Sequence, residues 1–543
     1  MTAARKRPRL APGVPQRLLP FFGIAMLFLA VLWPYRNYVP IWDGRVYADC
    51  AIHAAEQGLS LATLRCAGHP SQGYAFFLAA SQLDAPGDTA LLHLTDILLG
   101  LLAIASFRVV LARVFPGEMH RRSLDVVTLA AAMHPVLLSS LLQVNVDFGV
   151  YVFFFAALAA LMSGYMQLTI LFGTLLCFSK ETGVLAYGLM LALHTAFTMR
   201  VAAGSTRERA ERLVPLLPTL IPLALFAVYV LTWHETRAEP VIWKHGWQTT
   251  TIDGFSFFDL SDPIFLSYAA GIFVLGFGWV VTAIVSADIF AGAARMVRRL
   301  PGRAVEGANA NALAFITVLT VVLTYVLTSF RTWSNLRYFA LLYPLILLLG
   351  YAALVRLRVS VLAKNGVLVA LVILFFVAQT RSIDPVSQRV YGTFSAGQKP
   401  MYRMSSITNE YHGPGRDELV YNLEFTGYHD VQNAFFTRLP MTDATAIATS
   451  NTVGLKLFAP LDWGTRRRTL RPTSIITPRY TDEIELLADV GRPAEVWYLE
   501  FSNRPDNDRA LESLHALYAE GGIVRTYKDG QLLVAHRLTL KAK

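Results

Sequence analysis

Five ionisable residues lie at the ends of long apolar stretches of this sequence or interrupt them: Asp43, Asp147, Lys180, Glu181 and Arg337. A carboxyl group beside apolar surface has a raised pKa and is a stronger base once it is ionised. Arginine and lysine side chains can hold a phosphate group. Charged residues at membrane depth cost about 2.5–3.5 kcal/mol each at a helix centre, so they are candidates for function by default. The set indicates general-base chemistry and phosphate binding at a membrane surface.

Each of these residues also has a structural explanation, which the sequence leaves open. Asp43 could be a solvated helix cap, and Asp147 could be the N-cap of the apolar run that follows it, where the helix dipole favours a negative charge. Lys180 and Glu181 could pair with each other at an external helix break. Arg337 could anchor its helix at the membrane interface.

The elements that must position these residues are membrane helices. Of 543 residues, 54% are hydrophobic and only 16% are charged, whereas a soluble protein has about 25% charged residues. The three cysteines form neither a disulfide framework nor a zinc-type spacing. A bilayer crossing needs about 20 apolar residues, and we predict eleven crossings, of which the short fifth and the sixth could form a broken hairpin. They lie near residues 19–36, 90–114, 124–141, 146–163, 168–178, 184–199, 214–233, 264–290, 311–330, 337–355 and 365–380.

The basic residues predict how these helices are oriented. One set of alternate connections, which includes the N-terminus, holds 20 Lys and Arg residues, and the other short connections hold 8. The positive-inside bias makes the N-terminus cytoplasmic, and an odd number of crossings places the C-terminal segment outside. We therefore expect a basic cytoplasmic segment (1–18), a membrane domain (19–380) and an extracytoplasmic domain (381–543). The net charge of +10 is explained by topology, so no nucleic-acid partner is expected.

Two external segments have patterns of their own. The first external connection, 37–89, predicts two amphipathic helices along the membrane surface, and Cys50 and Cys66 within it could form a disulfide or be two independent small hydrophobic residues. Residues 381–543 predict a soluble α/β domain. Its end shows a strand at 497–502, a helix stopped by Gly521 and Gly522, and a hairpin of strands 523–528 and 531–537.

Several motifs, in order along the chain, resemble the GT-C superfamily of glycosyltransferases. An acidic residue, Asp43, follows the first span; a His-Pro pair starts HPSQGYAFFLAASQL; and a Gly-Asp pair leads into the second span. Later blocks read HPVLLSSLLQVNVDFGV, LLCFSKETGVLAYGLMLAL and LRYFALLYPLILLLGYAAL. The likeness covers roughly residues 20–380 and is nearest to the branch of protein O-mannosyltransferases and lipid A aminoarabinose transferases. It implies a GT-C-like helical membrane fold and a polyprenyl-phosphate-linked sugar donor.

The resemblance also implies roles for individual residues. Asp43 would be the general base that deprotonates the acceptor hydroxyl, and Lys180 and Arg337 would hold the donor phosphate. The family often has a second acid directly after the first, where this sequence has Gly44, so Asp147 is the stronger second catalytic candidate. Further candidates are Glu181 as an orienting or acceptor-site acid, and His69, Tyr74, Tyr338 and Tyr343 as substrate-binding residues.

These inferences predict an inverting membrane glycosyltransferase of the EC 2.4 type, acting on the extracytoplasmic face of the cell membrane. The acceptor could be a glycan, a lipid or a protein. No metal signature is evident, although Asp43 and Asp147 could share a divalent cation through oxygen ligands. Two alternatives remain: a transporter or flippase of a lipid-linked glycan, for which no internal repeat is visible, and a non-catalytic protein of glycan assembly.

Overall fold

A computed structural model of the chain describes most of the helical part and portions of the C-terminal part. The described residues are 14–201, 211–233, 279–298, 305–328, 336–357, 360–378, 395–400, 434–435, 445–449, 475–476, 494–501, 508–528 and 531–542, except 39, 41, 67–68, 212 and 397–398. All structural statements below concern these residues.

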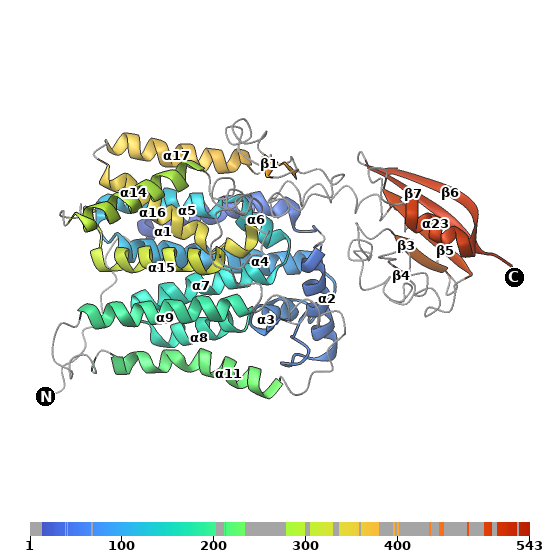
Figure 1. Cartoon of the computed structure of the whole chain (residues 1–543), viewed down its shortest axis with the longest axis horizontal. Coiled ribbons are helices and arrows are strands. Elements are labelled where there is room, and N and C mark those ends of the chain that lie inside the picture. Colours follow the sequence, from blue (N-terminus) through green and yellow to red (C-terminus); the bar gives the residue numbers. More distant parts are fainter. Residues whose placement is uncertain are drawn as a thin grey trace.

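The helical body is built from helices that coincide with the predicted apolar stretches (Figure 1). Each of the eleven stretches overlaps at least one described helix, although residues 264–278 of the eighth lie outside the described part. The helices are α1 (Val14–Leu32), η1 (Trp33–Tyr35), α4 (Thr89–Val114), η2 (Glu118–His120), α5 (Arg121–Ala132), α6 (Pro135–Leu142), α7 (Val146–Ser163), α8 (Met166–Cys177), α9 (Glu181–Val201), η3 (Val214–Leu220), α11 (Ile221–Trp233), α14 (Trp279–Val297), α15 (Ala310–Thr328), η6 (Leu336–Phe339), α16 (Leu342–Arg356) and α17 (Val361–Ala378).

Among the described residues, five helices are long and apolar enough to cross a membrane, and a sixth crossing is possible if a bent pair counts as one span. That pair corrects the predicted single span 124–141, because α5 and α6 meet at an angle of 47°. The bend lies just before Pro135, because proline begins α6 and cannot continue the preceding helix. The number of eleven crossings stays a prediction.

One helix, α7, forms the centre of this body. In its 18-residue apolar window, 89% of residues are buried inside the protein. It packs against α4 and α8, and Gly149 brings it close to α3, since a Cβ there would lie 2.7 Å from Cβ of Tyr74. Because it is buried on all sides, α7 fixes the position of any side chain at its first turn.

The first external connection contains the two predicted helices, α2 (Trp42–Gln57) and α3 (Gln72–Ser81). A disulfide joins Cys50 of α2 to Cys66, in the segment that leads to α3, so the pairing left open by the sequence is present. The second helix differs from the expectation of a surface helix, because six of its ten residues are buried. Glycine at position 73 permits this insertion: its N–H donates to the carbonyl of Phe178 at 2.7 Å, and a Cβ would overlap with Leu175.

The described strands of the C-terminal part form a five-stranded sheet of order β4-β3-β5-β7-β6. These strands are β3 (Thr445–Thr449), β4 (Ile475–Ile476), β5 (Glu495–Phe501), β6 (Tyr518–Lys528) and β7 (Gln531–Leu540); β1 (Ser395–Ala396) and β2 (Lys399–Pro400) pair separately. Strand β3 is parallel to β4 and β5, whereas β5, β7 and β6 are antiparallel neighbours.

The sheet agrees with most of the predicted order of strand, helix and hairpin. The register pairs Lys528 with Gln531, as a two-residue hairpin connection requires. The helix α23 (Asp508–Leu517) is shorter than predicted, because β6 begins at Tyr518, before the two glycines. Leu514 of this helix packs on buried Val496 and Tyr498 of the sheet.

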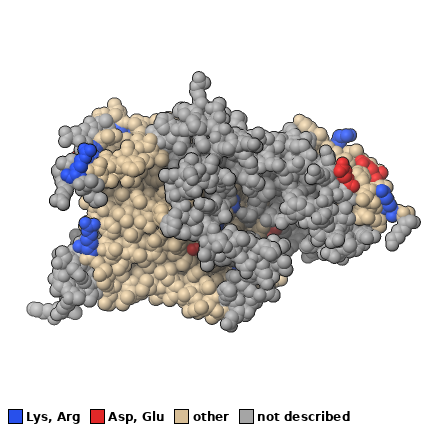
Figure 2. Space-filling view, in the orientation of Figure 1, with Lys and Arg blue, Asp and Glu red and all other residues tan. Residues whose placement is uncertain are grey.

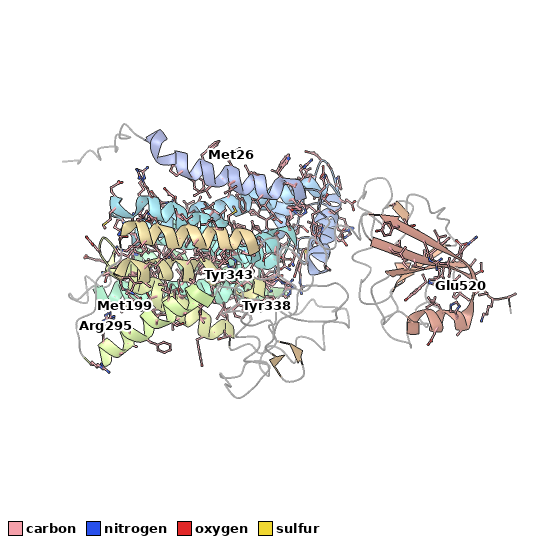
Figure 3. All side chains as sticks on the ribbon, turned by 90° about the horizontal axis from the view of Figure 1, so that it is seen from above. Met26, Met199, Arg295, Tyr338, Tyr343 and Glu520 are labelled. Carbon is pink, nitrogen blue, oxygen red and sulfur yellow. A yellow bond between two sulfur atoms is a disulfide. The ribbon has the colours of Figure 1, made fainter. Side chains whose placement is uncertain are left out.

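The two ends of the helical body differ in charge. Figure 2 shows Lys and Arg side chains at the end that lies away from the sheet, and Figure 3 places Arg295 and Met199 at that end. Figure 3 shows Tyr338 nearer the opposite end, on the side of α2 and the sheet.

Candidate functional site

The candidate site begins at the junction between α6 and α7. Gln143 is the C-cap of α6 and Asn145 is the N-cap of α7, whose side-chain oxygen accepts a hydrogen bond from the N–H of Asp147 at 3.1 Å. The N-cap explanation of Asp147 is therefore wrong, because Asn145 already fills that role. Between the caps, buried Val144 has a φ of 52°, which is costly for a β-branched residue and is found mainly where function demands it.

Asp147 is instead the centre of a buried cluster of charges. Lys180 Nζ lies 2.7 Å from Asp147 Oδ1, and Arg337 Nε lies 3.6 Å from Asp147 Oδ2. The side chains of all three are nearly buried, with exposed fractions of 5% for Asp147, 11% for Lys180 and 8% for Arg337. Residues from the start of α7, the α8–α9 turn and η6 thus meet; we call these three residues the charged triad.

Two further residues complete the surroundings of the charged triad. Gln143 Oε1 accepts a hydrogen bond from Arg337 Nη1 at 3.2 Å. The ring of Tyr338 lies under both cations, 4.4 Å from Lys180 Nζ and 5.5 Å from the guanidinium carbon of Arg337, within the range of a cation–π interaction. The carboxylate, the amide oxygen and the ring hold two like charges close together.

The charged triad brings two cations to one carboxylate. Lys180 and Arg337 both face Asp147 in a nearly buried place. Burial by itself lowers the pKa of the Lys180 ammonium, but the Asp147 carboxylate outweighs this and the pKa is raised above its ordinary value. Lys180 is therefore charged at neutral pH. Two cations held close together in this way are suited to bind an anionic group.

The backbone of α2 passes directly beside this cluster. Gly44 is buried, and a Cβ at that position would overlap with the carbonyl oxygen of Gln143. Asp43 precedes Gly44 in the first turn of α2; its side chain lies outside the described part of the structure. The glycine that replaces the second acid of the family pattern thus has a packing reason, since only glycine permits this close approach.

A second polar contact lies next to the charged triad in the chain. His69 Nδ1 and Glu181 Oε2 are 3.0 Å apart, and their side chains are 18% and 32% exposed. Glu181 is the first residue of α9 and directly follows Lys180. The structure therefore brings together two more of the residues predicted from the sequence.

Two predicted tyrosines have other surroundings. Tyr74 is fully buried, and its hydroxyl donates to Asp96 Oδ1 of α4 at 2.8 Å. Tyr343 is buried and stacks on His134, with ring centroids 4.1 Å apart. Figure 3 shows Tyr343 and Tyr338 as labelled side chains of the same region of the helical body. Both buried rings are engaged in interior contacts, for which we infer a role in packing.

The described residues do not favour a divalent cation at Asp147. Both of its oxygens already face cations, which would repel a metal ion, and the described residues contain no group of three or more His, Cys, Asp or Glu residues that could hold a metal. We derive no catalytic step through a metal.

The sequence did not identify Gln143 and Asn145 as parts of the site. Both belong to a short polar interruption, QVNVD, between apolar runs that form α6 and α7. Polar residues at such a break were a usable signal, because a buried amide needs a hydrogen-bond partner.

No family model matches the sequence, and no curated protein is similar to it. Solved structures do resemble it. ArnT from Cupriavidus metallidurans in the apo state matches with a TM-score of 0.54 and 14% identity, over 95% of this chain and 98% of that chain. The structure of the same protein bound to undecaprenyl phosphate matches with a TM-score of 0.56 and 13% identity, over 96% of this chain and 98% of that chain. The arabinofuranosyltransferase AftD from Mycobacteria matches with a TM-score of 0.47 and 12% identity, over 97% of this chain and 40% of that chain.

The likeness to ArnT extends over nearly the whole length of both chains. At this level of identity it concerns the fold. The chain therefore shares the fold of these ArnT structures.

Proposed function

We propose that this protein is a membrane glycosyltransferase that moves a sugar from a polyprenyl-phosphate-linked donor to an acceptor on the extracytoplasmic face. The observation that carries the proposal is the charged triad, in which Lys180 and Arg337 converge on Asp147. The fold supports it, because a structure of the same architecture was solved with undecaprenyl phosphate bound.

In this proposal the charged triad binds the phosphate of the donor. A phosphodiester carries one negative charge, which two converging cations can stabilise. Lys180 Nζ and the Arg337 guanidinium donate hydrogen bonds to the phosphate oxygens, and Asp147 is a positioning residue that keeps the two cations together. Gln143 and Tyr338 fix Arg337 and Lys180 before the donor arrives, so little reorganisation is needed during the reaction.

Asp43 is the general base of the proposed reaction. Its carboxylate removes the proton of an acceptor hydroxyl while that oxygen attacks the anomeric carbon of the sugar. The bond from this carbon to the phosphate oxygen breaks, and its electron pair leaves with the polyprenyl phosphate. Attack from the side opposite the leaving group inverts the anomeric configuration. The close contact of Gly44 with Gln143 supports the assignment, because it holds this part of α2 against the triad.

The remaining assignments follow from this reaction. The partners are the lipid-linked donor, membrane lipids and an acceptor that is a glycan, a lipid or a protein. The segments 1–18, 19–380 and 381–543 correspond to a cytoplasmic N-terminus, the catalytic membrane domain and an extracytoplasmic domain. The protein lies in the cell membrane, with the basic end of the helical body in the cytoplasm (Figure 2).

The proposal is tested with purified protein and a radiolabelled polyprenyl-phosphate sugar. The Asp43→Asn variant should lose turnover by about 10²–10⁴-fold, the usual contribution of a general base, while still binding the donor. Glu56→Gln is the matched control, because Glu56 is an exposed acid of the same helix. Full turnover by Asp43→Asn would exclude Asp43 as the base. Movement of intact donor across liposomes without turnover would favour the transporter.

A further inference from the structure

A cavity of about 310 Å³ lies in the helical body between α5, α14, α16 and α17 (Figure 1). No residue of the charged triad is among the described residues that line it. Each of these lining side chains is aliphatic except that of Tyr351, whose hydroxyl lies 2.7 Å from His120 Nδ1 and so has a partner within the protein. The cavity is therefore suited to hydrocarbon and not to a polar ligand.

The cavity is open to its surroundings beside α17. Val367 and Ala370 of α17 both line it and both are exposed, Val367 to 44%. Because α17 coincides with a predicted membrane crossing, the surroundings of this opening are the hydrocarbon chains of the bilayer. An empty space would forfeit the dispersion contacts of its lining. A chain from the bilayer restores them, and since a cavity of roughly 150 Å³ holds one benzene ring, this one has room for about a dozen carbon atoms.

The lining face of α17 continues to a lysine at one end of the cavity. Lys364 precedes Val367 and Leu368 by one helical turn, so the three residues share a face of the helix. Lys364 Nζ donates to the carbonyl oxygen of Val355 at 3.4 Å, and Val355 directly follows Leu354, a lining residue of α16. An ammonium group thus lies at the end of the cavity where α16 ends.

Two contacts without net charge complete this end of the cavity. Arg356 of α16 forms an ion pair with Asp288 of α14, and Ser123 Oγ of α5 donates to Asn365 Oδ1 of α17 at 2.9 Å. Each of the four helices thus adds a polar side chain, and we call these four residues and Lys364 the polar rim. Within the described part of the chain, Lys364 belongs to no ion pair, so the rim carries one positive charge.

We propose that this cavity binds an anionic phospholipid of the membrane, with an acyl chain between the four helices and the headgroup at the polar rim. Lys364 Nζ donates to a phosphate oxygen of the headgroup, while Arg356 and Asp288 stay paired. A basic residue near the membrane surface favours an anionic lipid, whereas a zwitterionic headgroup offsets its own phosphate with a cation. The rim lies at the basic end of the helical body, the end of Arg295 in Figure 3.

The polyprenyl chain of the proposed donor is the other hydrocarbon that could fill the cavity. Its phosphate is proposed to lie at the charged triad, beside Tyr338 and away from the basic end in Figure 3. The polar rim would then meet a chain and not a headgroup, and the Lys364 ammonium would have no anion beside it. A phospholipid suits both the cavity and the rim, and its binding does not depend on the proposed function.

The test uses purified full-length protein in detergent and a phosphatidylglycerol that carries a photoreactive diazirine in one acyl chain. After illumination, mass spectrometry of the digested protein should find the label on peptides of α5, α14, α16 and α17. Unlabelled phosphatidylglycerol should prevent this labelling at an about fivefold lower concentration than phosphatidylcholine with the same chains, the factor that one basic residue contributes. Undecaprenyl phosphate should compete less well than phosphatidylglycerol.

Two pairs of variants connect the labelling to the named residues. Lys364→Gln should abolish the preference for phosphatidylglycerol, whereas Arg113→Gln, which removes a charge from the last turn of α4, should keep it. Ala370→Phe should fill the cavity and prevent labelling of the four helices, whereas Val369→Phe, at an exposed position outside the lining, should not. Thermal melting checks that each variant is folded. If Ala370→Phe does not fold, the first pair of variants still decides.

The outcomes separate this inference from the proposed function. Labelling of other helices only, or equal competition by the two phospholipids, would overturn the proposal. Loss of the preference in Arg113→Gln as well would overturn the role of Lys364, because the preference would then come from the overall charge of the basic end. Stronger competition by undecaprenyl phosphate than by phosphatidylglycerol would overturn the proposal in favour of the polyprenyl chain. None of these outcomes changes the expectation for turnover at the charged triad.

Discussion

Buried charged residues are paired differently at the two ends of the helical body. Toward the basic end, ionic contacts are formed by one cation and one anion: Arg108 of α4 bonds Asp125 of α5 at 2.8 Å, and Arg356 of α16 bonds Asp288 of α14. At the other end, Asp147 faces both Lys180 and Arg337. The first kind is neutral as a unit, and the second is not.

This difference separates structural charges from functional ones. A neutral pair that is hydrogen-bonded within itself needs no ligand, and it can join two helices in an apolar environment. A site that brings two cations together is costly, because like charges repel each other and burial removes their hydration. This site lies beside α2 and next to the strained Val144.

The largest expected effect comes from removing one cation of the triad. Lys180→Ala and Arg337→Ala should each reduce turnover by about 10²–10³-fold, the usual cost of losing one preorganised donor to a developing negative charge. Donor binding should also weaken, because either change makes the triad neutral. Initial rates and binding of undecaprenyl phosphate check this, and turnover within about threefold of the wild type would contradict it.

An intermediate effect is expected from moving α2 away from the triad. Gly44→Ala would force a Cβ against the carbonyl of Gln143, and relieving such an overlap typically costs about 1–3 kcal/mol. Turnover should fall because Gln143 holds Arg337.

The matched control for this change is Gly188→Ala in α9, where no atom lies within 4 Å of the new Cβ. Alanine should be neutral there or stabilise the helix by roughly 0.5–1 kcal/mol. Thermal melting and turnover of both variants are compared. A Gly44→Ala protein as active as Gly188→Ala would mean that α2 is not positioned by this contact.

The smallest effect is expected from replacing a neutral pair. Arg108→Leu combined with Asp125→Leu removes both charges, and such replacements are often neutral or stabilise a protein by about 1–4 kcal/mol. Turnover should remain at the wild-type level, because the pair lies away from the proposed site. A large loss of turnover with normal melting would show that the neutral pairs are not merely structural.

Much of the helical body could be predicted from hydropathy, but the breaks could not. Each predicted stretch overlaps a helix, whereas the span 124–141 is divided into α5 and α6. Hydropathy averages over a window, so it does not register the bend at which Pro135 begins α6. The N-cap alternative for Asp147 stayed open for a similar reason, since N-cap preference alone does not distinguish Asn145 from Asp147.

In the C-terminal part, local elements could be predicted from the sequence, but the pairing of distant strands could not. Strand alternation and the Asp529-Gly530 dipeptide predict β5 and the hairpin of β6 and β7 correctly. The parallel pairing of β3 with β4 and β5 was not predicted, because it joins segments that are far apart in the sequence. Local propensity contains no information about such pairings.

By itself, the sequence determined that this protein is a bundle of membrane helices with charges at a few defined positions. A backbone inside the bilayer must satisfy its own hydrogen bonds, as a helix does, and the length of each apolar stretch decides where such a helix can form. Only the tertiary structure decided which of these charges meet. Lys180 is 33 residues from Asp147, and Arg337 is 194 residues from Gln143. Contacts over such separations depend on how the helices pack, and packing is what brings isolated charges together into one site.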